Sequence, residues 1–101
     1  MDRLFPVLVR GPSMVPALRD GDALLVRRTG RVRPGDVVVV RFTGVPGLSV
    51  KRAVRPVEGG WWVEGDNPYG STDSRELGPA QVVGRVVLRW WPGISRVGPR
   101  R

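Results

Sequence analysis

Ser13 is the first residue whose type and surroundings suggest chemistry. It lies in residues 11–16, GPSMVP, where two prolines restrict the backbone on either side of its hydroxyl. A restricted backbone holds one side chain still, as a serine nucleophile requires. The same short pattern also fits an ordinary turn whose serine faces solvent, because short motifs recur by chance. A nucleophile and a plain turn therefore both remain open for this segment.

Lys51 is the second candidate, because it is the only lysine among the 17 lysines and arginines of the chain. The chain contains no histidine and no cysteine, which excludes a Ser-His-Asp triad, a Cys-His pair, disulfides and histidine or thiolate metal sites. Arginine stays protonated in proteins. The base for Ser13 is then a carboxylate, a tyrosine, an N-terminal amine or a lysine made neutral by burial. A lysine retained by chance is the plain alternative for Lys51.

The size and charge of the chain limit its class. Its 101 residues fit one domain that must be stable through packing alone, since cysteine is absent. The aliphatic run at residues 37–40 is far shorter than the roughly 20 residues of a membrane-spanning helix, and residues 1–6 do not resemble a signal peptide. A soluble, cytoplasmic protein is expected, with peripheral membrane binding as the alternative. The formal charge of +8 comes from scattered arginines, which is typical of a solvated surface.

The elements that must position Ser13 and Lys51 are strands and turns. Segments rich in aliphatic and β-branched residues alternate with Gly, Pro and Asp turns, and no helix longer than a turn or two is indicated. The expected class is all-β, a small and mostly antiparallel sheet or partly open barrel with minimal helix. Strands are expected at residues 4–9, 23–26, 37–42, 48–54 and 82–91, with the last interrupted by a glycine, and a Gly-Gly hairpin is expected at 57–64.

These strands place the two candidates differently. The first strand ends shortly before Ser13, so the serine lies in a turn at a strand end. Within the fourth strand, alternation puts Lys51 on one face with small neighbours that leave room for an approaching hydroxyl. Burial against apolar neighbours, for which Val50, Ala53 and Met14 are candidates, would lower the pKa of the lysine.

Two segments in the second half of the chain lack the pattern of a strand. Residues 65–79 are polar and turn-rich, which is typical of a functional loop in a small domain. Residues 93–101 form a basic segment rich in Pro, Gly and Arg, for which a flexible tail is expected. The catalytic domain would then span residues 1–92.

Several motifs follow one another along the chain: SMVP at 13–16, GD at 21–22, PGDVV at 34–38, VKR at 50–52, GDN at 65–67 and STDSR at 71–75. This is the order found in bacterial type I signal peptidases, and the chain resembles that family over roughly residues 9–90. The segment of residues 65–75, with G-D-N followed by S-x-D-S-R, is much more specific than S-M-x-P alone. LexA-type self-cleaving repressors share the serine and lysine elements but not this last box.

The resemblance implies a serine endopeptidase with a Ser-Lys dyad. Ser13 would be the nucleophile, and its backbone N–H would be the oxyanion donor. Lys51 would be the general base, with the Ser71 hydroxyl bonded to its amine to orient it. Met14 would help to line a shallow pocket for small substrate side chains. No cofactor and no metal are expected.

The resemblance also implies two ion pairs that support the site. Asp66 would pair with Arg52, and Asp73 with Arg75, holding the polar loop against the lysine strand. Taken singly, each aspartate also fits a turn-forming side chain that bonds its own backbone.

The chain departs from the family pattern in two ways. Gly11 stands where some members carry a serine that contributes to the oxyanion hole, and Pro12 has no N–H; losing one oxyanion donor costs about two to three orders of magnitude in rate. The sequence also predicts no membrane anchor, and the large β insertion of the family is expected to be reduced to the hairpin with Trp61 and Trp62. Among small soluble relatives it is most similar to the proteases that trim the N-terminal extension of nickel-type superoxide dismutase. The expected partner is a protein or peptide with small residues before the cut.

Two other functions remain open. The chain could be a signal peptidase-like enzyme that acts at a membrane surface with a separate anchor, or a basic β-module that binds single-stranded nucleic acid by stacking. Nucleic acid is not the expected partner, and the sequence does not indicate an oligomeric state. The tryptophans that bear on both alternatives are Trp61, Trp62, Trp90 and Trp91, for which core packing is the plain reading.

Overall fold

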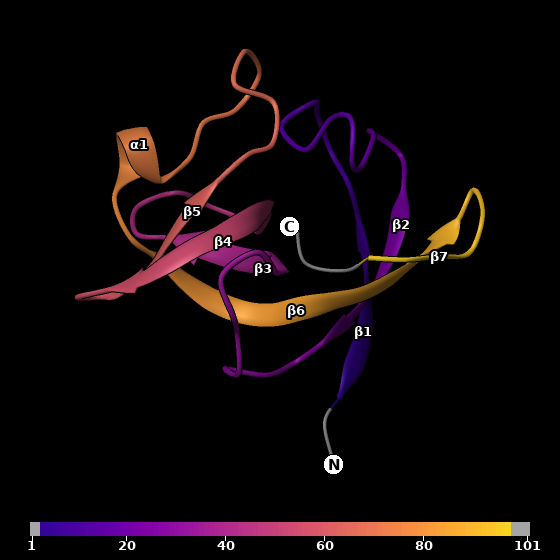
Figure 1. Ribbon diagram of the computed structural model, residues 1–101, viewed down its shortest axis with the longest axis horizontal. Helices are drawn as coiled ribbons and strands as arrows, with labels where there is room; N and C mark the ends of the chain where they lie inside the picture. The colour runs from indigo at the N-terminus through magenta and orange to yellow at the C-terminus, as the bar shows by residue number, and fades with distance from the viewer. Residues whose placement is uncertain (1–2, 98–101) are drawn as a thin grey trace.

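A computed structural model describes residues 3–97 of the chain as an all-β protein with one short helix (Figure 1). The elements are β1 (Leu4–Leu8), β2 (Ala23–Arg27), β3 (Val37–Phe42), β4 (Ser49–Val57), β5 (Gly60–Glu64), α1 (Ser74–Leu77), β6 (Ala80–Trp91) and β7 (Ser95–Arg96). The predicted all-β class is therefore confirmed.

The strands form one antiparallel sheet that closes into a partial ring. Its order is β1-β2-β6-β3-β4-β5, with β7 added to β6. β5 returns to β6 where Trp61 lies opposite Ala80, so β6, β3, β4 and β5 enclose a ring from which β1 and β2 extend. Figure 1 shows the long β6 curving across the molecule and linking these two parts.

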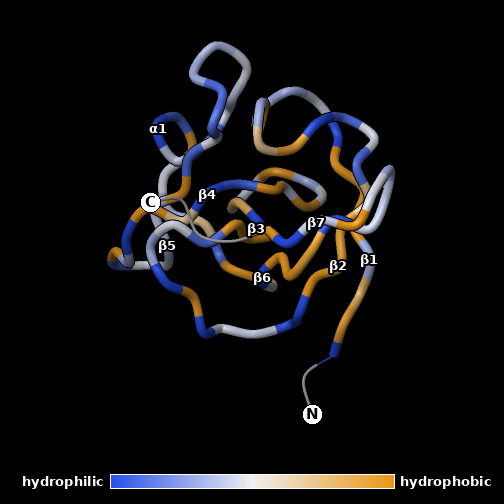
Figure 2. The backbone as a smooth tube through the Cα atoms, turned by 45° about the vertical axis from the view of Figure 1, so that its right-hand side comes forward, coloured by the Kyte–Doolittle hydropathy of each residue, from blue (hydrophilic) through white to orange (hydrophobic). Residues whose placement is uncertain are grey.

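β3 lies between two hydrophobic clusters, which explains its uninterrupted run of valines. Val37 and Val39 belong to the first cluster, whereas Val38 and Val40 belong to the second. Figure 2 shows the hydrophobic colouring mostly along the central strands, with paler or blue loops around them. The first cluster also contains Val9, Met14, Leu18, Leu24, Val26 and Val86, and the second contains Phe42, Ala53, Val63 and Ala80.

The sequence suggested that Gly84 interrupts the last long strand, but in the structure the strand is continuous. β6 continues through this residue, and a Cβ added at Gly84 would lie 2.6 Å from the carbonyl oxygen of Arg27 and 2.7 Å from a methyl carbon of Val26. The glycine thus permits the close approach of β2 to β6, beside the point where their register shifts.

Part of the segment expected to be a flexible tail is paired in the structure. β7 lies beside β6, with Arg96 opposite Leu88 and Ser95 opposite Arg89. β3 pairs with β6 only as far as Arg85, so the second edge of the long strand is open beyond that residue and accepts β7. Residues 98–101 of the expected tail lie outside the described part of the chain.

The polar segment of residues 65–79 contains the one helix of the described chain, α1, whose first turn is capped by Asp73. With four residues, this helix is too short to cross a membrane, and residues 3–97 contain no other helix that could do so.

Candidate active site

Ser13 lies in a tight turn that is fixed by backbone hydrogen bonds and by two buried side chains. Within the turn, the N–H of Val15 donates to the Pro12 carbonyl oxygen at 3.1 Å, and the N–H of Leu18 donates to the Met14 carbonyl oxygen at 2.9 Å. The side chains of Met14 and Leu18 are buried in the first cluster, whereas Ser13 itself is half-buried. The turn therefore presents the serine at the surface while its neighbours fix the backbone.

Met14 is fully buried in this core. It supports the serine turn from beneath and has no exposed surface in this structure. Its expected place in a substrate pocket remains a prediction.

Lys51 is buried within the sheet, with 5% of its surface exposed. It lies opposite Val38 on the paired strands β4 and β3, and Ala53 follows on the same face of β4. Val38 and Ala53 both belong to the second cluster. Val50, expected as a wall of the lysine site, packs against the first cluster instead, because neighbouring residues of a strand face opposite sides.

The surroundings of Lys51 favour its neutral form. Burial lowers the pKa of the amine from its ordinary value of 10.5 because desolvation disfavours the ammonium ion. The negative charge of Asp73 raises the pKa in part, and the positive charge of Arg75 lowers it again. The pKa of the lysine is thus shifted in the direction that a general base requires.

Asp73 is the centre of the polar cluster beside the lysine. Its Oδ2 accepts hydrogen bonds from the Ser71 hydroxyl at 2.6 Å, the Gly65 N–H at 2.8 Å and the Arg75 guanidinium at 2.7 Å. Burial raises the pKa of the carboxyl, but the bonds from Arg75, Ser71 and the backbone outweigh it and hold this pKa well below its ordinary value. Asp73 is therefore a fixed negative charge close to Lys51.

Both expected ion pairs are present in the structure. Arg75 pairs with Asp73 at 2.7 Å, and Arg52 pairs with Asp66 at 2.7 Å between its terminal nitrogen and Oδ2. The Arg52 guanidinium also donates to the carbonyl oxygen of Gly35 at 2.9 Å, so it links the polar loop to the turn before β3. The supporting roles of the two pairs in catalysis remain predictions.

Ser71 directs its hydroxyl proton to Asp73. A hydroxyl that donates one hydrogen bond still has lone pairs that can accept another. The expected bond between Ser71 and the Lys51 amine is thus compatible with this arrangement, with the lysine N–H as the donor.

Gly65 and Asn67, to which the sequence analysis gave no separate role, join the polar loop to the serine turn. A Cβ added at Gly65 would overlap the Ser71 hydroxyl and lie 2.6 Å from the Ser13 carbonyl oxygen. The N–H of Asn67 donates to that same carbonyl at 2.8 Å. The glycine and asparagine of the GDN motif marked these positions, but the contacts join residues far apart in the chain. The structure thereby brings the Ser13 backbone to Ser71, and Ser71 to the carboxylate that acts on Lys51.

Within residues 3–97 no group of three or more His, Cys, Asp or Glu side chains is arranged to hold a metal ion. The site described above consists of hydroxyl, amine, carboxylate and guanidinium groups. Such a set can carry out acyl transfer through a serine with an amine as its base.

Replacing Asp73 with asparagine is expected to lower the free energy of unfolding by about 1–3 kcal/mol at pH 7, because the donors around this buried side chain lose a charged acceptor. The folded state holds the pKa of Asp73 below its ordinary value of 3.8. The contribution of Asp73 to the free energy of unfolding is therefore complete above about pH 4, and it is lost as the pH falls through the pKa that Asp73 has in the folded state. Urea unfolding at several pH values should show the wild type and Asp73→Asn converging in acid.

Glu76→Gln is the matched control, since this exposed acidic residue lies on the same short helix. A surface change of this kind is expected to stay within about 0.5 kcal/mol. Equal stability of Asp73→Asn and the wild type at pH 7 would show that the cluster around Asp73 contributes nothing to folding.

Comparisons with known proteins agree with this chemistry. A family model described as Peptidase S24-like matches residues 1–87. The mitochondrial inner membrane protease subunit 1 of Xenopus tropicalis is 32% identical over 121 aligned residues, which cover 92% of this chain and 72% of the relative. The mitochondrial ATP-independent inner membrane protease subunit 1a of Arabidopsis thaliana is 34% identical over 115 residues, covering 83% and 68%.

The human mitochondrial inner membrane protease subunit 1 is 27% identical and aligns with 92% of this chain and 75% of its own length. The family model extends over Ser13, Lys51 and the polar loop of residues 65–79. The match covers most of the 101 residues. The chain belongs to the Peptidase S24-like family of serine endopeptidases.

Proposed function

We propose that Ser13 and Lys51 form the catalytic dyad of a peptidase that removes an N-terminal peptide from a protein substrate. One observation carries the proposal: the only lysine of the chain is buried, its pKa is lowered by desolvation, and it lies within the field of Asp73. The polar loop that holds Asp73 also bonds to the backbone of Ser13. The serine turn and the lysine strand thus share one supporting structure.

The proposed chemistry uses the Lys51 amine, in its neutral form, as the base for the Ser13 hydroxyl. Lys51 takes the proton of the Ser13 hydroxyl as its oxygen attacks the peptide carbonyl, and the Ser13 N–H stabilises the oxyanion. The ammonium of Lys51 then gives its proton to the leaving amine, which leaves an acyl-enzyme. The neutral amine next takes a proton from water, whose hydroxide attacks the ester and releases the second product. Each proton taken by Lys51 is returned within the cycle.

The electrostatic balance at Lys51 suits this cycle. Desolvation lowers the pKa of the amine and so favours its neutral form, and the nearby carboxylate of Asp73 would stabilise the ammonium that forms transiently. Ser71, which donates its own proton to Asp73, would accept a hydrogen bond from the amine and so orient its lone pair. Asp73, Arg75, Arg52 and Asp66 would hold this geometry without reacting.

An extended peptide is the substrate that fits the sheet. Within the described residues, β1 pairs with β2 alone and leaves one edge open, and Ser13 follows a few residues after the end of this strand. A peptide that adds to a sheet edge gains main-chain hydrogen bonds, with alternate side chains entering pockets. Small residues at the first and third positions before the cut are the expected specificity.

The natural substrate remains open. The relatives named above are described as subunits of mitochondrial inner membrane proteases. A role in maturing nickel-type superoxide dismutase rests on the small size of the chain, and it stays a prediction.

A pH profile tests the proposed base. Cleavage of a peptide with alanine at the first and third positions before the cut is expected to rise with pH as Lys51 loses its proton. Because the pKa of Lys51 is lowered from 10.5, the midpoint should lie clearly below that value. Mass spectrometry of the products at each pH gives both the rate and the cut site. A midpoint at or above the ordinary value for lysine would contradict the proposal.

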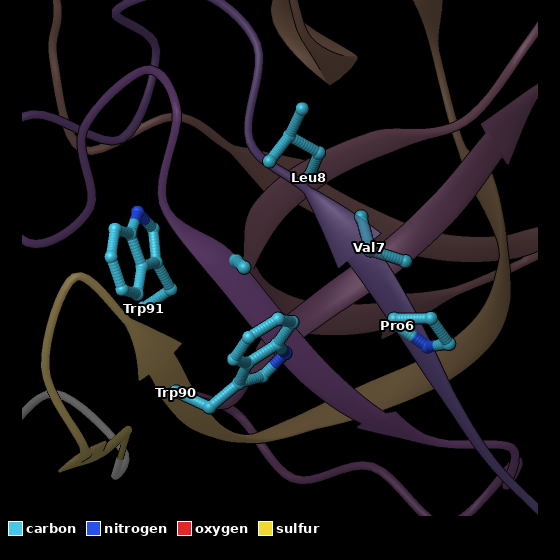
Figure 3. A pocket seen from close by; sticks show the side chains of 6 residues that line it. Pro6, Val7, Leu8, Trp90 and Trp91 are labelled. Carbon is cyan, nitrogen blue, oxygen red and sulfur yellow. The ribbon is translucent and has the colours of Figure 1, made fainter.

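An exposed apolar surface favours a second possibility, that the enzyme acts at a membrane. Trp91 is 60% exposed, and Trp90 and Leu8 are each about half exposed. They surround a cavity that Figure 3 shows between β1 and the end of β6. The cavity has a volume of about 510 Å³. The residues that line it, here called the tryptophan surface, are Pro6, Val7, Leu8, Ala23, Trp90 and Trp91.

The other two tryptophans have structural roles instead. Trp61 packs against the second cluster. Trp62 donates to Glu64 at 2.9 Å and lies under the guanidinium of Arg55, 5.0 Å from the ring centre. Of the four tryptophans considered for membrane contact, Trp90 and Trp91 therefore remain the candidates.

We infer that the tryptophan surface contacts anionic lipid. Indole rings prefer the interface of a membrane, and a chain with a formal charge of +8 is attracted to an anionic surface. The relatives whose names include an inner membrane point the same way. No anchor is required for such peripheral contact.

Flotation with vesicles that contain anionic lipid tests this contact. The double variant Trp90→Ser and Trp91→Ser should bind at least about tenfold more weakly, because each buried aromatic ring contributes about 1.5 kcal/mol or more. Tyr69→Ser is the control, since Tyr69 is exposed but lies on the polar loop. Equal flotation of the double variant and the wild type would rule out the tryptophan surface as the contact.

A further inference from the structure

Asn67 contacts the backbone on both sides of the proposed nucleophile. Its side-chain nitrogen Nδ2 donates to the Pro12 carbonyl oxygen at 3.1 Å, and its own N–H donates to the Ser13 carbonyl oxygen at 2.8 Å. Asn67 is 55 residues from Pro12 in the chain. Figure 1 shows the loop between β5 and α1 beside the loop that follows β1.

The bond to Pro12 fixes the direction of the Ser13 N–H. The Pro12 carbonyl and the Ser13 N–H belong to one planar peptide group, and this peptide is not among the cis bonds of the described chain. In a trans peptide the N–H points opposite to the carbonyl. A donor that holds the carbonyl of Pro12 on one side therefore holds the N–H of Ser13 on the other.

The Ser13 N–H is available for a ligand. Among residues 3–97, no backbone carbonyl accepts a hydrogen bond from it. The Pro12 carbonyl oxygen of the same peptide group, in contrast, accepts two hydrogen bonds, from Asn67 Nδ2 and from the N–H of Val15. Hydrogen bonds in a chain polarise one another, so bonds to the carbonyl make the N–H of the same peptide a stronger donor.

Asn67 is itself held in this orientation. Its Oδ1 accepts from the N–H of Tyr69 at 3.1 Å, which places the amide nitrogen toward Pro12. A Cβ at Gly70 would lie 2.8 Å from that nitrogen and 3.0 Å from a ring carbon of Pro12. Glycine at this position leaves the space in which the side chain of Asn67 meets the serine turn.

We infer that Asn67 is a positioning residue for the oxyanion donor: its amide aligns and polarises the Pro12–Ser13 peptide so that the Ser13 N–H meets the oxyanion. The inference rests on the proposed function of Ser13. It addresses the departures at Gly11 and Pro12, which leave the Ser13 N–H as the main donor that can be named. Asn67 acts through the peptide and does not touch the substrate.

Two variants at this position test the inference. Asn67→Asp keeps the acceptor for Tyr69 and lacks the donor to Pro12, whereas Asn67→Ala removes the donor without adding a charge. At the alkaline plateau of the pH profile, kcat is expected to fall about tenfold to a hundredfold in both, less than for complete loss of an oxyanion donor, with KM within about twofold. The backbone N–H of residue 67 keeps its bond to Ser13 in both variants.

A pair of inhibitors separates positioning from a general loss of structure. A peptide aldehyde bonds to the Ser13 oxygen through its carbonyl carbon and adopts the tetrahedral geometry of the transition state. A peptide with a reduced scissile bond has no such oxygen. In both variants the aldehyde should bind more weakly by the same factor as kcat, and the reduced peptide should bind as it does to the wild type.

The controls separate this inference from the proposed function. Tyr69→Ala, in the same loop and 97% exposed, should keep the wild-type kcat. If Ser13→Ala still cleaves, the proposed function fails and the inference fails with it. If Ser13→Ala is inactive but both Asn67 variants keep the wild-type kcat, or lose affinity for both inhibitors equally, the inference alone is overturned.

Discussion

Ser13→Ala is expected to abolish peptide cleavage, with a loss of at least about four orders of magnitude in kcat, because the attacking oxygen is removed. The fold should be nearly unchanged. The residue is half-buried in a turn that is fixed by its backbone bonds and by its buried neighbours Met14 and Leu18. Removing one hydroxyl there should change the free energy of unfolding by no more than about 0.5 kcal/mol.

Product formation by mass spectrometry and thermal unfolding, measured on the same samples, check both halves of this expectation. Thr72→Ala is the matched control, since it removes a hydroxyl from the exposed side of the adjoining polar loop. Cleavage by Ser13→Ala at the wild-type rate would end the assignment of the nucleophile. A large drop in melting temperature would instead show that the hydroxyl supports the turn.

Lys51→Arg is expected to lower cleavage by at least about two to four orders of magnitude, the range for losing a positioned base. Arginine preserves the positive charge but cannot supply a neutral amine. Its planar head is also broader than an ammonium group, and Lys51 is buried beside Val38 and Ala53 of the second cluster. Both effects act on the reaction without changing the net charge of the protein.

This substitution separates the peptidase from the alternatives that depend on charge. Attraction to nucleic acid or anionic lipid should be nearly unchanged in Lys51→Arg, because the number of cations is the same. Arg55→Lys is the matched control on the exposed part of β4. Activity should be measured from about pH 6 to 10, a range below the ordinary pKa of lysine. Wild-type cleavage by Lys51→Arg over this range would exclude Lys51 as the base, and with no histidine in the chain the Ser13 mechanism would have to be abandoned.

The expected effect of Lys51→Arg depends on the burial of the polar cluster around Asp73. Asp73 is 1% exposed and Lys51 is 5% exposed, so charges interact more strongly there than they would in water. Asp73 is held ionised by Arg75, Ser71 and the Gly65 N–H. A carboxylate that stays charged at all working pH values leaves Lys51 as the group that titrates.

Much of the fold followed from local patterns in the chain. β-Branched runs bounded by Gly, Pro and Asp indicate strands whatever their partners, and β3 has the predicted bounds, Val37–Phe42. β4 and β6 are longer than expected, since β4 continues through Pro56 and β6 begins at Ala80 and runs uninterrupted through Gly84. Their pairing with neighbouring strands, which a local pattern does not contain, extends them.

The chemistry of the candidate site was also largely visible in residue types. The absence of histidine and cysteine left few bases for a serine, and one lysine among 17 basic residues marked the candidate. Alternation along a strand predicted that Lys51 and Ala53 share a face, and both are buried. These inferences needed only the covalent chemistry and the period of a strand.

The contacts that assemble the site depend on residues far apart in the chain, and no local pattern contains them. The register of β3 against β4 makes Val38 the neighbour of Lys51 and turns Val50 to the other cluster. The meeting of the polar loop with the serine turn gives Asn67 its bonds to Pro12 and Ser13. Strand register is set by which side chains the whole core can bury, and loop contacts by where the strands end. Both are properties of the packed molecule, whereas residue type and alternation belong to the chain before it folds.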